Sequence, residues 1–257
     1  VRFGVNAGNS IESGGNYNVV VGDEAGTAIT TGDENTFLGY AAGDANTTGT
    51  NNVATGTDAF GRNTTGSGNT AVGRTSLSFN TTASNNTAVG LSALLANTTG
   101  TGNTAVGASA LDASTTASYN VAIGLSALSA DTLGAHAVAI GAGALSRQNF
   151  TSATNNYNIG IGYDAGLNVT TGIENTLIGG LAGDAITDAD YNVAVGKGAL
   201  GTNQLGSRNT AVGTNSLNIA NPASAVNTYN TALGYDAGYA VTTGIYNTLI
   251  GGLAGDA

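Results

Sequence analysis

The chain has 257 residues, of which 41 are glycine, one is proline and none is cysteine, and its formal net charge is −10. Zero cysteine excludes disulfides and thiolate metal sites, and the single proline excludes a collagen helix. Only six Lys and Arg residues oppose sixteen acidic ones. This balance argues against a nucleic-acid partner. The sequence contains no run of 18 apolar residues, so it does not predict a membrane-spanning helix.

A glycine recurs along the chain at a nearly constant spacing. Of the fourteen intervals from Gly4 to Gly251, eleven share the 17-residue period, one is a single residue longer and two are four residues longer. The two long intervals contain insertions at about residues 146–157 and 218–229. We therefore predict fifteen units that form one continuous repeat domain over residues 1–257, a fragment of a longer fibre. The glycines expected to bend the chain after Gly4 are Gly22, Gly39, Gly56, Gly73, Gly90, Gly107, Gly124, Gly141, Gly162, Gly179, Gly196, Gly213, Gly234 and Gly251.

An asparagine stands four residues before almost every one of these bend glycines. Stacked asparagine side chains form hydrogen-bonded ladders when identical strands lie above one another. Ala137 interrupts the series. The asparagines expected to form this ladder are Asn18, Asn35, Asn52, Asn69, Asn86, Asn103, Asn120, Asn158, Asn175, Asn192, Asn209, Asn230 and Asn247.

The residues between each asparagine and its glycine predict short strands. They are mostly β-branched or small and apolar, from 19–21 and 36–38 at the start of the chain to 231–233 and 248–250 near its end. A second short strand is expected around pairs such as Ala110-Leu111, followed by a polar turn such as NTTG at 46–49 or 97–100. A unit this short has no room for a helix as well. The sequence thus predicts an all-β parallel β-solenoid of about fifteen coils.

The predicted strands are small or apolar on both faces, as Thr104, Ala105 and Val106 illustrate. One face lines the interior of the coil, and the other requires a cover. The simplest cover is another copy of the chain, which predicts a homo-oligomer, with three chains as the expected number. A monomeric solenoid with an alanine-lined interior is the alternative.

A longer repeat lies over the short one. Residues 157–185 and 229–257 agree at 23 of 29 positions, and residues 17–45 share their frame. Such similarity indicates duplication of a block of several coils. It is more natural for a shaft of variable length than for a catalytic domain.

Units such as NTAVGASAL (103–111), NVAIGLSAL (120–128) and NTAVGLSAL (86–94) resemble repeats of trimeric autotransporter adhesin heads, which are left-handed parallel β-rolls. They are still more similar to the NTAxGxxAL repeats of phage tail-fibre-like proteins. The resemblance covers essentially the whole chain. It implies a left-handed, trimeric, extracellular or virion-borne fibre that reaches a host surface. The 17-residue period is longer than that of adhesin heads, and coiled-coil stalk, anchor and fibre chaperone are missing from the sequence.

Two patterns that suggest an enzyme are explained by the repeat. GTGNTA (100–105) and GSGNTA (66–71) match the glycine fingerprint of a dinucleotide-binding turn, but a strand follows where that site needs a helix. His136 could be combined with Ser129 and Asp131 into a catalytic relay, yet a lone histidine between alanines favours a surface residue. We expect no catalytic residue, no cofactor and no enzyme.

Other binding chemistry has weaker support. Recurring carboxylates could hold Ca²⁺, but solubilising charge is favoured because the calcium β-roll nonapeptide is absent. Thr-Thr pairs such as Thr47-Thr48 do not form the regular threonine array on a strand that ice binding needs. The glycosylation sequons at Asn46 and Asn97 are explained by the sequence of the turn. Tyrosines could stack on sugars if exposed. The carboxylates are Asp44, Asp164, Asp184, Asp236 and Asp256, and the tyrosines are Tyr40, Tyr163, Tyr235 and Tyr239.

The sequence thus predicts a structural fibre or adhesin segment, the shaft or head of a virion tail fibre or cell-surface appendage. Its expected partners are further copies of itself and a host-surface glycan or receptor. The uncapped strand edges of the first and last coils leave an end-to-end extracellular filament as the alternative. A carbohydrate-active β-helix enzyme is disfavoured, since six basic residues spread over 257 do not form a catalytic face.

Overall fold

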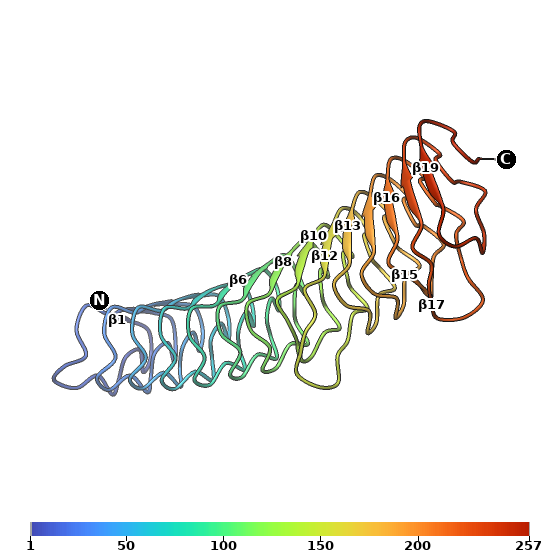
Figure 1. Cartoon of the computed structure of the whole chain (residues 1–257). Helices are drawn as coiled ribbons and strands as arrows, with labels where there is room; N and C mark the ends of the chain where they lie inside the picture. Colours follow the sequence, from blue (N-terminus) through green and yellow to red (C-terminus); the bar gives the residue numbers. More distant parts are fainter. Residues whose placement is uncertain (1, 257) are drawn as a thin grey trace. The chain divides into compact units, whose positions relative to one another are not determined.

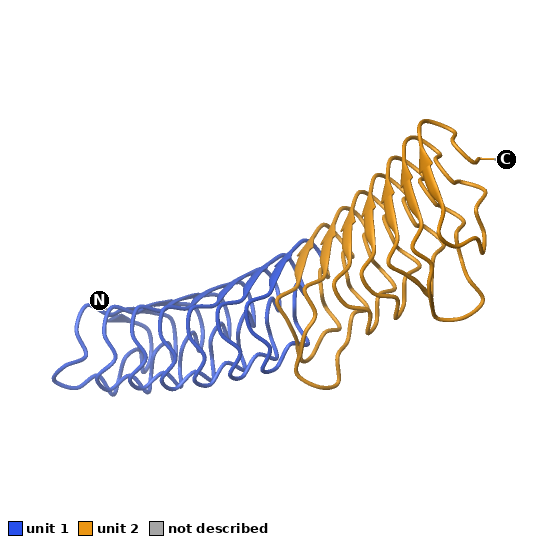
Figure 2. Cartoon of the chain, viewed as in Figure 1, with its two compact units in different colours: residues 1–125 blue, residues 126–257 orange. Residues whose placement is uncertain are grey.

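The computed structural model describes residues 2–256, and the chain forms two compact units, residues 1–125 and 126–257 (Figure 2). In the described residues every regular element is a β-strand. Each unit is a stack of coils, and each coil contributes one short strand that pairs in parallel with the equivalent strand of the next coil (Figure 1). The predicted all-β parallel solenoid, with about fifteen coils and a 17-residue period, is confirmed.

The first unit contains eight paired strands. Their register follows the repeat, since each residue pairs with its equivalent in the next coil, Thr87 with Thr104 and Ala88 with Ala105. The strands are β1 (Arg2–Phe3), β2 (Val19–Val21), β3 (Thr36–Leu38), β4 (Val53–Thr55), β5 (Thr70–Val72), β6 (Thr87–Val89), β7 (Thr104–Val106) and β8 (Val121–Ile123).

The second unit contains seven strands of the same kind and two small additional sheets. The seven are β10 (Val138–Ile140), β12 (Ile159–Ile161), β13 (Thr176–Ile178), β14 (Val193–Val195), β16 (Thr210–Val212), β18 (Thr231–Leu233) and β19 (Thr248–Ile250). The additional sheets pair β9 (Gly134–Ala135) with β11 (Thr154–Asn155) and β15 (Gly206–Ser207) with β17 (Val226–Asn227). Residues 146–157 and 218–229, the predicted insertions, contain β11 and β17, so each insertion adds a short strand that pairs with the coil before it.

Each three-residue strand turns its middle residue into the coil, and in β12 that residue is Gly160, which has no side chain. Except for Leu249, the middle residue is buried in every such strand, whereas the first and third residues are half-buried or exposed. Stacked coils thereby bury a column of mostly alanine, interrupted by larger residues such as Phe37 and Leu177. The core of each unit lies inside the coils.

The segment after each bend glycine is a run of turns rather than the second strand expected from the sequence. Between β7 and the next coil, residues 108–113 are turns. Ser109 and Leu111 both have a φ of 53°, which lies in the left-handed region that interrupts a strand. Ala110 and Leu111 are nevertheless fully buried. The alternating conformation curls the chain tightly while it still directs both side chains inward.

Glycine replaces the inward leucine where the core needs room. A Cβ atom added to Gly43 would lie 2.6 Å from Cδ2 of Phe37, and one added to Gly183 would lie 2.7 Å from Cδ2 of Leu177. In most coils whose middle strand residue is alanine, as in β5, the corresponding turn position is a buried leucine such as Leu77. In these coils a large turn residue compensates for the small strand residue, which keeps the interior close-packed.

Candidate functional site

The predicted asparagine series lies inside the coils, one residue before each strand. Asn35 Nδ2 donates to Asn18 Oδ1 at 3.1 Å, and Asn52 Nδ2 donates to Asn35 Oδ1 at the same distance. The same Oδ1 atoms also accept the backbone N–H of the next asparagine, at 2.9 Å and 3.0 Å. The remaining Nδ2 proton of Asn52 goes to the carbonyl of Gly66 at 2.9 Å. Each carboxamide therefore joins two coils and closes its own coil.

The bend glycines bring successive coils close together. Gly39 and Gly107 have φ values of 138° and 134°, a region that is essentially restricted to glycine. A Cβ atom added to Gly39 would lie 2.6 Å from the carbonyl oxygen of Gly56 in the next coil. Any side chain at this position would push the coils apart.

A second interior ladder, which the sequence analysis missed, runs seven residues after the bend glycines. Asn63 Nδ2 donates to Asn46 Oδ1 at 2.7 Å, and Asn80 Nδ2 donates to Asn63 Oδ1 at 2.8 Å. Asn97 continues the ladder to Asn80 at 2.9 Å. The signal is the asparagine of the NTTG turns and of NTTA at 80–83, which have the composition of ordinary polar turns. All four side chains are fully buried, so Asn46 and Asn97 do not present accessible glycosylation sites.

The second ladder ends at a serine in the first unit. Ser114 occupies the next position in the series, and its buried Oγ has no hydrogen-bond partner within residues 2–256. In the same part of the chain, Asn97 Oδ1 is also buried without a partner. The serine side chain is too short to donate to it, so one hydrogen bond between coils is lost here.

In the second unit, other side chains replace the missing asparagine at position 137. Asn156, from the first insertion, accepts the backbone N–H of Asn158 at 2.9 Å, the role that the preceding ladder asparagine has elsewhere. Asn158 Nδ2 in turn donates to Gln148 Oε1 at 2.8 Å, and Gln148 Nε2 donates to Asp131 Oδ2 at 2.6 Å. The insertion thus links the two ladder positions through Gln148.

The three residues considered for a catalytic relay form separate contacts. Ser129 Oγ donates to the carbonyl of Ser146 at 3.4 Å, and the His136 ring packs against Tyr157 with centroids 5.3 Å apart. Asp131 is buried, and its Oδ1 also accepts the backbone N–H of Gly134 at 2.9 Å. Burial raises the pKa of the Asp131 carboxyl, although its hydrogen bonds oppose that shift. Asp131 is therefore held by the interior network, and the contacts described here do not join it to Ser129 or His136.

The outer face of the main sheets is uncharged. We use "outer face" for the first and third residues of the strands β2–β8 in the first unit and of β10, β12–β14, β16, β18 and β19 in the second. In all of these strands both positions are Val, Ile, Leu or Thr. Several of the side chains are exposed, including Leu38, Ile123, Leu233 and Ile250. In each unit this face is an uncharged strip of aliphatic and threonine side chains.

Tyrosines are exposed on the coils. Tyr40, Tyr163 and Tyr235 directly follow bend glycines, Tyr239 lies in a later turn, and all four are exposed, as a role in binding would require. Another set directly precedes the ladder asparagines and stacks from coil to coil in the second unit. Arg208 lies 4.3 Å from the ring centroid of Tyr191, and the rings of Tyr229 and Tyr246 stack with centroids 5.4 Å apart. These contacts add coil-to-coil attraction outside the core.

The recurring carboxylates do not gather into a cation site within residues 2–256, where no group of three or more His, Cys, Asp or Glu side chains is placed to hold a metal ion. Burial raises the pKa of Asp44 and of Asp184.

The paired threonines mainly form hydrogen bonds between coils. Thr47 Oγ1 donates to the carbonyl of Thr64 at 2.9 Å, and Thr64 Oγ1 to that of Thr81 at 3.1 Å.

Together these contacts define a repeat protein of the parallel β-solenoid class, whose coils are held by two interior ladders and backbone hydrogen bonds. No protein-family model, no curated protein and no solved structure matches the chain. Within the described residues there is no helix of the length and apolarity that a membrane span requires.

Proposed function

We propose that the chain is a non-enzymatic structural segment, the shaft or head of an extracellular fibre on a virion or cell surface, which provides reach and attachment. The observation that carries this proposal is that the inner and the outer side chains of each coil have different roles. Buried side-chain amides such as those of Asn52 and Asn86 bond to neighbouring coils, while the outer face remains uncharged and partly exposed. This arrangement favours a stable stack of coils with a lateral binding surface.

The partner we propose for the outer face is the same face of further copies, with three chains around a common axis. Charged residues are depleted from the centre of stable interfaces, and exposed apolar patches mark association surfaces. Every coil presents the same pair of positions, so identical chains can meet in register along their length. Charge repulsion does not oppose this contact, because the net charge of −10 is carried elsewhere on the coils.

The oligomeric state tests this part of the proposal. Sedimentation equilibrium or light scattering of the purified chain should give three times the 25.0 kDa of one copy. A stable monomer over the micromolar range would contradict the trimer. Negative-stain micrographs should show discrete particles of one length, whereas filaments of indefinite length would favour end-to-end polymerisation.

The location of the protein tests the fibre function itself. Antibodies against the chain, coupled to gold, should label appendages on intact virions or cells. Label confined to the interior of cells would overturn the proposal. Removal of the fibres should reduce attachment to the host surface, and a host-surface glycan or receptor is the partner proposed for that step.

A further inference from the structure

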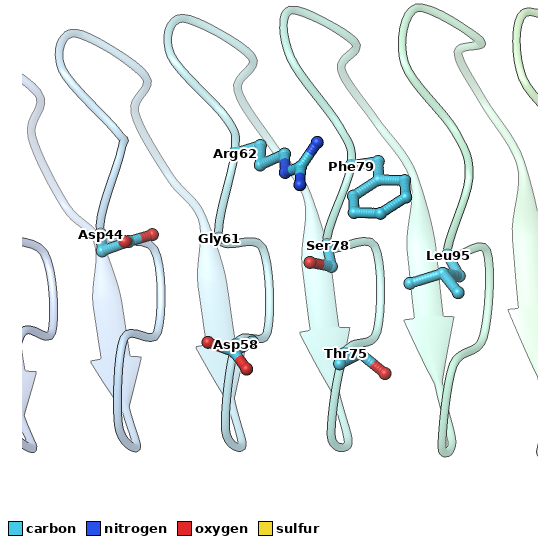
Figure 3. Close-up of a pocket in the computed structure, with 8 residues that line it drawn as sticks. All are labelled: Asp44, Asp58, Gly61, Arg62, Thr75, Ser78, Phe79 and Leu95. Atoms are coloured by element: carbon cyan, nitrogen blue, oxygen red, sulfur yellow. The ribbon is translucent and has the colours of Figure 1, made fainter.

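A shallow hollow of about 440 Å³ opens on the first unit, away from the outer face. It is formed by side chains of four successive coils, which converge around Gly61 (Figure 3). The neighbouring coils have larger residues at the position equivalent to Gly61, namely Asp44, Ser78 and Leu95. The missing side chain of Gly61 therefore creates the hollow.

Acceptor groups face each other across this space. A Cβ atom added to Gly61 would lie 3.4 Å from Asp44 Oδ1 and 3.8 Å from Ser78 Oγ. In Figure 3 the Asp44 carboxylate and the Ser78 hydroxyl point toward Gly61 from opposite sides, and Asp58 lies below it. A small group placed over Gly61 would meet both oxygens at once.

Ser78 is the most informative residue of the hollow. Its side chain is only 7% exposed, and its Oγ forms no hydrogen bond within residues 2–256. The hydroxyl opens into the hollow, so a group bound there can supply the hydrogen-bond partner that the protein does not.

The charge of the hollow favours a cation. Asp44 is half-buried, and its pKa is raised by burial and by the neighbouring charges of Asp58 and Glu24. Arg62 also lines the hollow, with its guanidinium over the ring of Phe79, 4.1 Å from the centroid. The two carboxylates of the lining, Asp44 and Asp58, outnumber this one positive charge, and Leu95 supplies an apolar wall.

We propose that this hollow binds a small ligand through a primary ammonium group. The ammonium protons are donated to the Asp44 carboxylate and to Ser78 Oγ, and the carbon body of the ligand lies against Leu95. The ammonium group gives the Ser78 hydroxyl a partner and offsets the carboxylate charge of the hollow. The proposal goes beyond the fibre function and does not depend on it.

Saturation-transfer NMR and calorimetry with n-butylammonium test the proposal, with 1-butanol and glucose as neutral comparison probes. We expect binding of n-butylammonium and at least tenfold weaker binding of both neutral probes. Equal binding of 1-butanol, a preference for glucose, or no binding of n-butylammonium would overturn the proposal.

Two variants locate the binding to the hollow. Gly61→Leu should abolish it by filling the space, and leucine is already accommodated at the equivalent position by Leu95. Asp44→Asn should weaken binding at least tenfold, whereas the matched variant Asp112→Asn, which changes an equivalent carboxylate three coils away from Gly61, should leave it within twofold. Equal losses in the two asparagine variants would show non-specific attraction to acidic residues and contradict the site. Circular dichroism verifies that each variant is folded.

Discussion

A single buried carboxamide in this protein satisfies several partners at once. Asn86 accepts the backbone N–H of Asn103 at 2.9 Å, donates to the carbonyl of Gly100 at 2.9 Å and donates to Asn69 Oδ1 at 3.3 Å. A buried group that loses its partner costs about 1–3 kcal/mol. The stability of the stack therefore depends on buried polar groups as well as on apolar packing.

We expect Asn86→Ala to lower the free energy of unfolding by about 2–4 kcal/mol, because it leaves a buried N–H and two buried oxygen acceptors with fewer partners. Urea denaturation followed by circular dichroism measures the change. The control is Asn9→Ala, at an exposed position, which should alter stability by less than about 0.5 kcal/mol. Equal effects of the two variants would show that the ladder contributes nothing specific.

Ser114→Asn should stabilise the first unit. The longer side chain would donate to the unpartnered Asn97 Oδ1 and to the carbonyl of Ala117, as Asn80 does to Asn63 Oδ1 at 2.8 Å and to the carbonyl of Ala83 at 3.0 Å. The gain expected from completing this rung is about 1–2 kcal/mol. Thermal and urea denaturation would reveal it, and Ser114→Ala provides the comparison that removes the hydroxyl without completing the ladder. A destabilised asparagine variant would contradict the proposed geometry.

Asp131 makes stability depend on pH. Burial raises its pKa above the ordinary value of 3.8 in the folded state, so the folded protein retains this proton to a higher pH than the unfolded chain. The Asp131 carboxyl therefore contributes most to the stability of the folded state at low pH. Its contribution to the free energy of unfolding declines as the pH rises above about 4, and the decline ends once the pH exceeds the folded-state pKa.

Asp131→Asn should remove this decline. The amide can bond as Asn203 does, whose Oδ1 accepts the Gly206 N–H at 3.0 Å and whose Nδ2 donates to the Gly206 carbonyl at 2.7 Å. Denaturation curves between pH 4 and 8 should show the variant gaining on the wild type as the pH rises. A stability difference independent of pH would indicate that the Asp131 pKa is the same in both states.

At the scale of the coil, the strand segment was predictable from the sequence, and the segment after the bend glycine was not. The strand segment was predictable because Asn, three apolar residues and Gly recur in nearly every coil. The following segment was wrongly predicted as a strand because Ala110 and Leu111 have strand-like burial, while the left-handed backbone at Ser109 and Leu111 has no compositional signature. The second ladder was missed for a related reason. Asparagine is common in exposed turns, and only the path of the chain shows that Asn63 and Asn80 point inward.

The bend glycines give a direct test of coil spacing. Gly39→Ala should destabilise the protein by about 3 kcal/mol or more, because its Cβ meets the carbonyl of Gly56 and its φ of 138° is unfavourable for alanine. Gly61→Ala is the matched control, since the nearest atom to its new Cβ is 3.4 Å away. The two variants can be compared by thermal denaturation. If both variants have the same melting temperature, close approach of the coils does not explain the regular spacing of these glycines along the chain.

At the scale of the whole molecule, the outer face is the surface that we propose for association. A lysine at this face would place a charge in the centre of the proposed trimer interface. We expect Val106→Lys to shift the sedimentation mass toward one chain, while Thr116→Lys, at an exposed position of the next turn, leaves it unchanged. Both variants should retain their β circular dichroism. A trimer that survives Val106→Lys would exclude the outer face as the contact.

The number of chains and the occupant of the Gly61 hollow could not be derived from the sequence. The strand pattern indicated an uncovered apolar face, but symmetry depends on how whole faces meet. The hollow arises because Asp44 and Ser78 occupy the position of Gly61 in the coils directly before and after it. Such a coincidence becomes visible only when the coils are stacked.

The short repeat also has a kinetic consequence. Most residues that pair across neighbouring strands are one 17-residue repeat apart in a chain of 257. The sequence separation divided by the chain length is about 0.07, a relative contact order typical of fast-folding helical bundles rather than of other β proteins. Each coil needs only its predecessor as a template, so a folding chain can add coils one after another as it emerges from the ribosome. A β protein built in this way avoids the long loop closures that make most sheets slow to form.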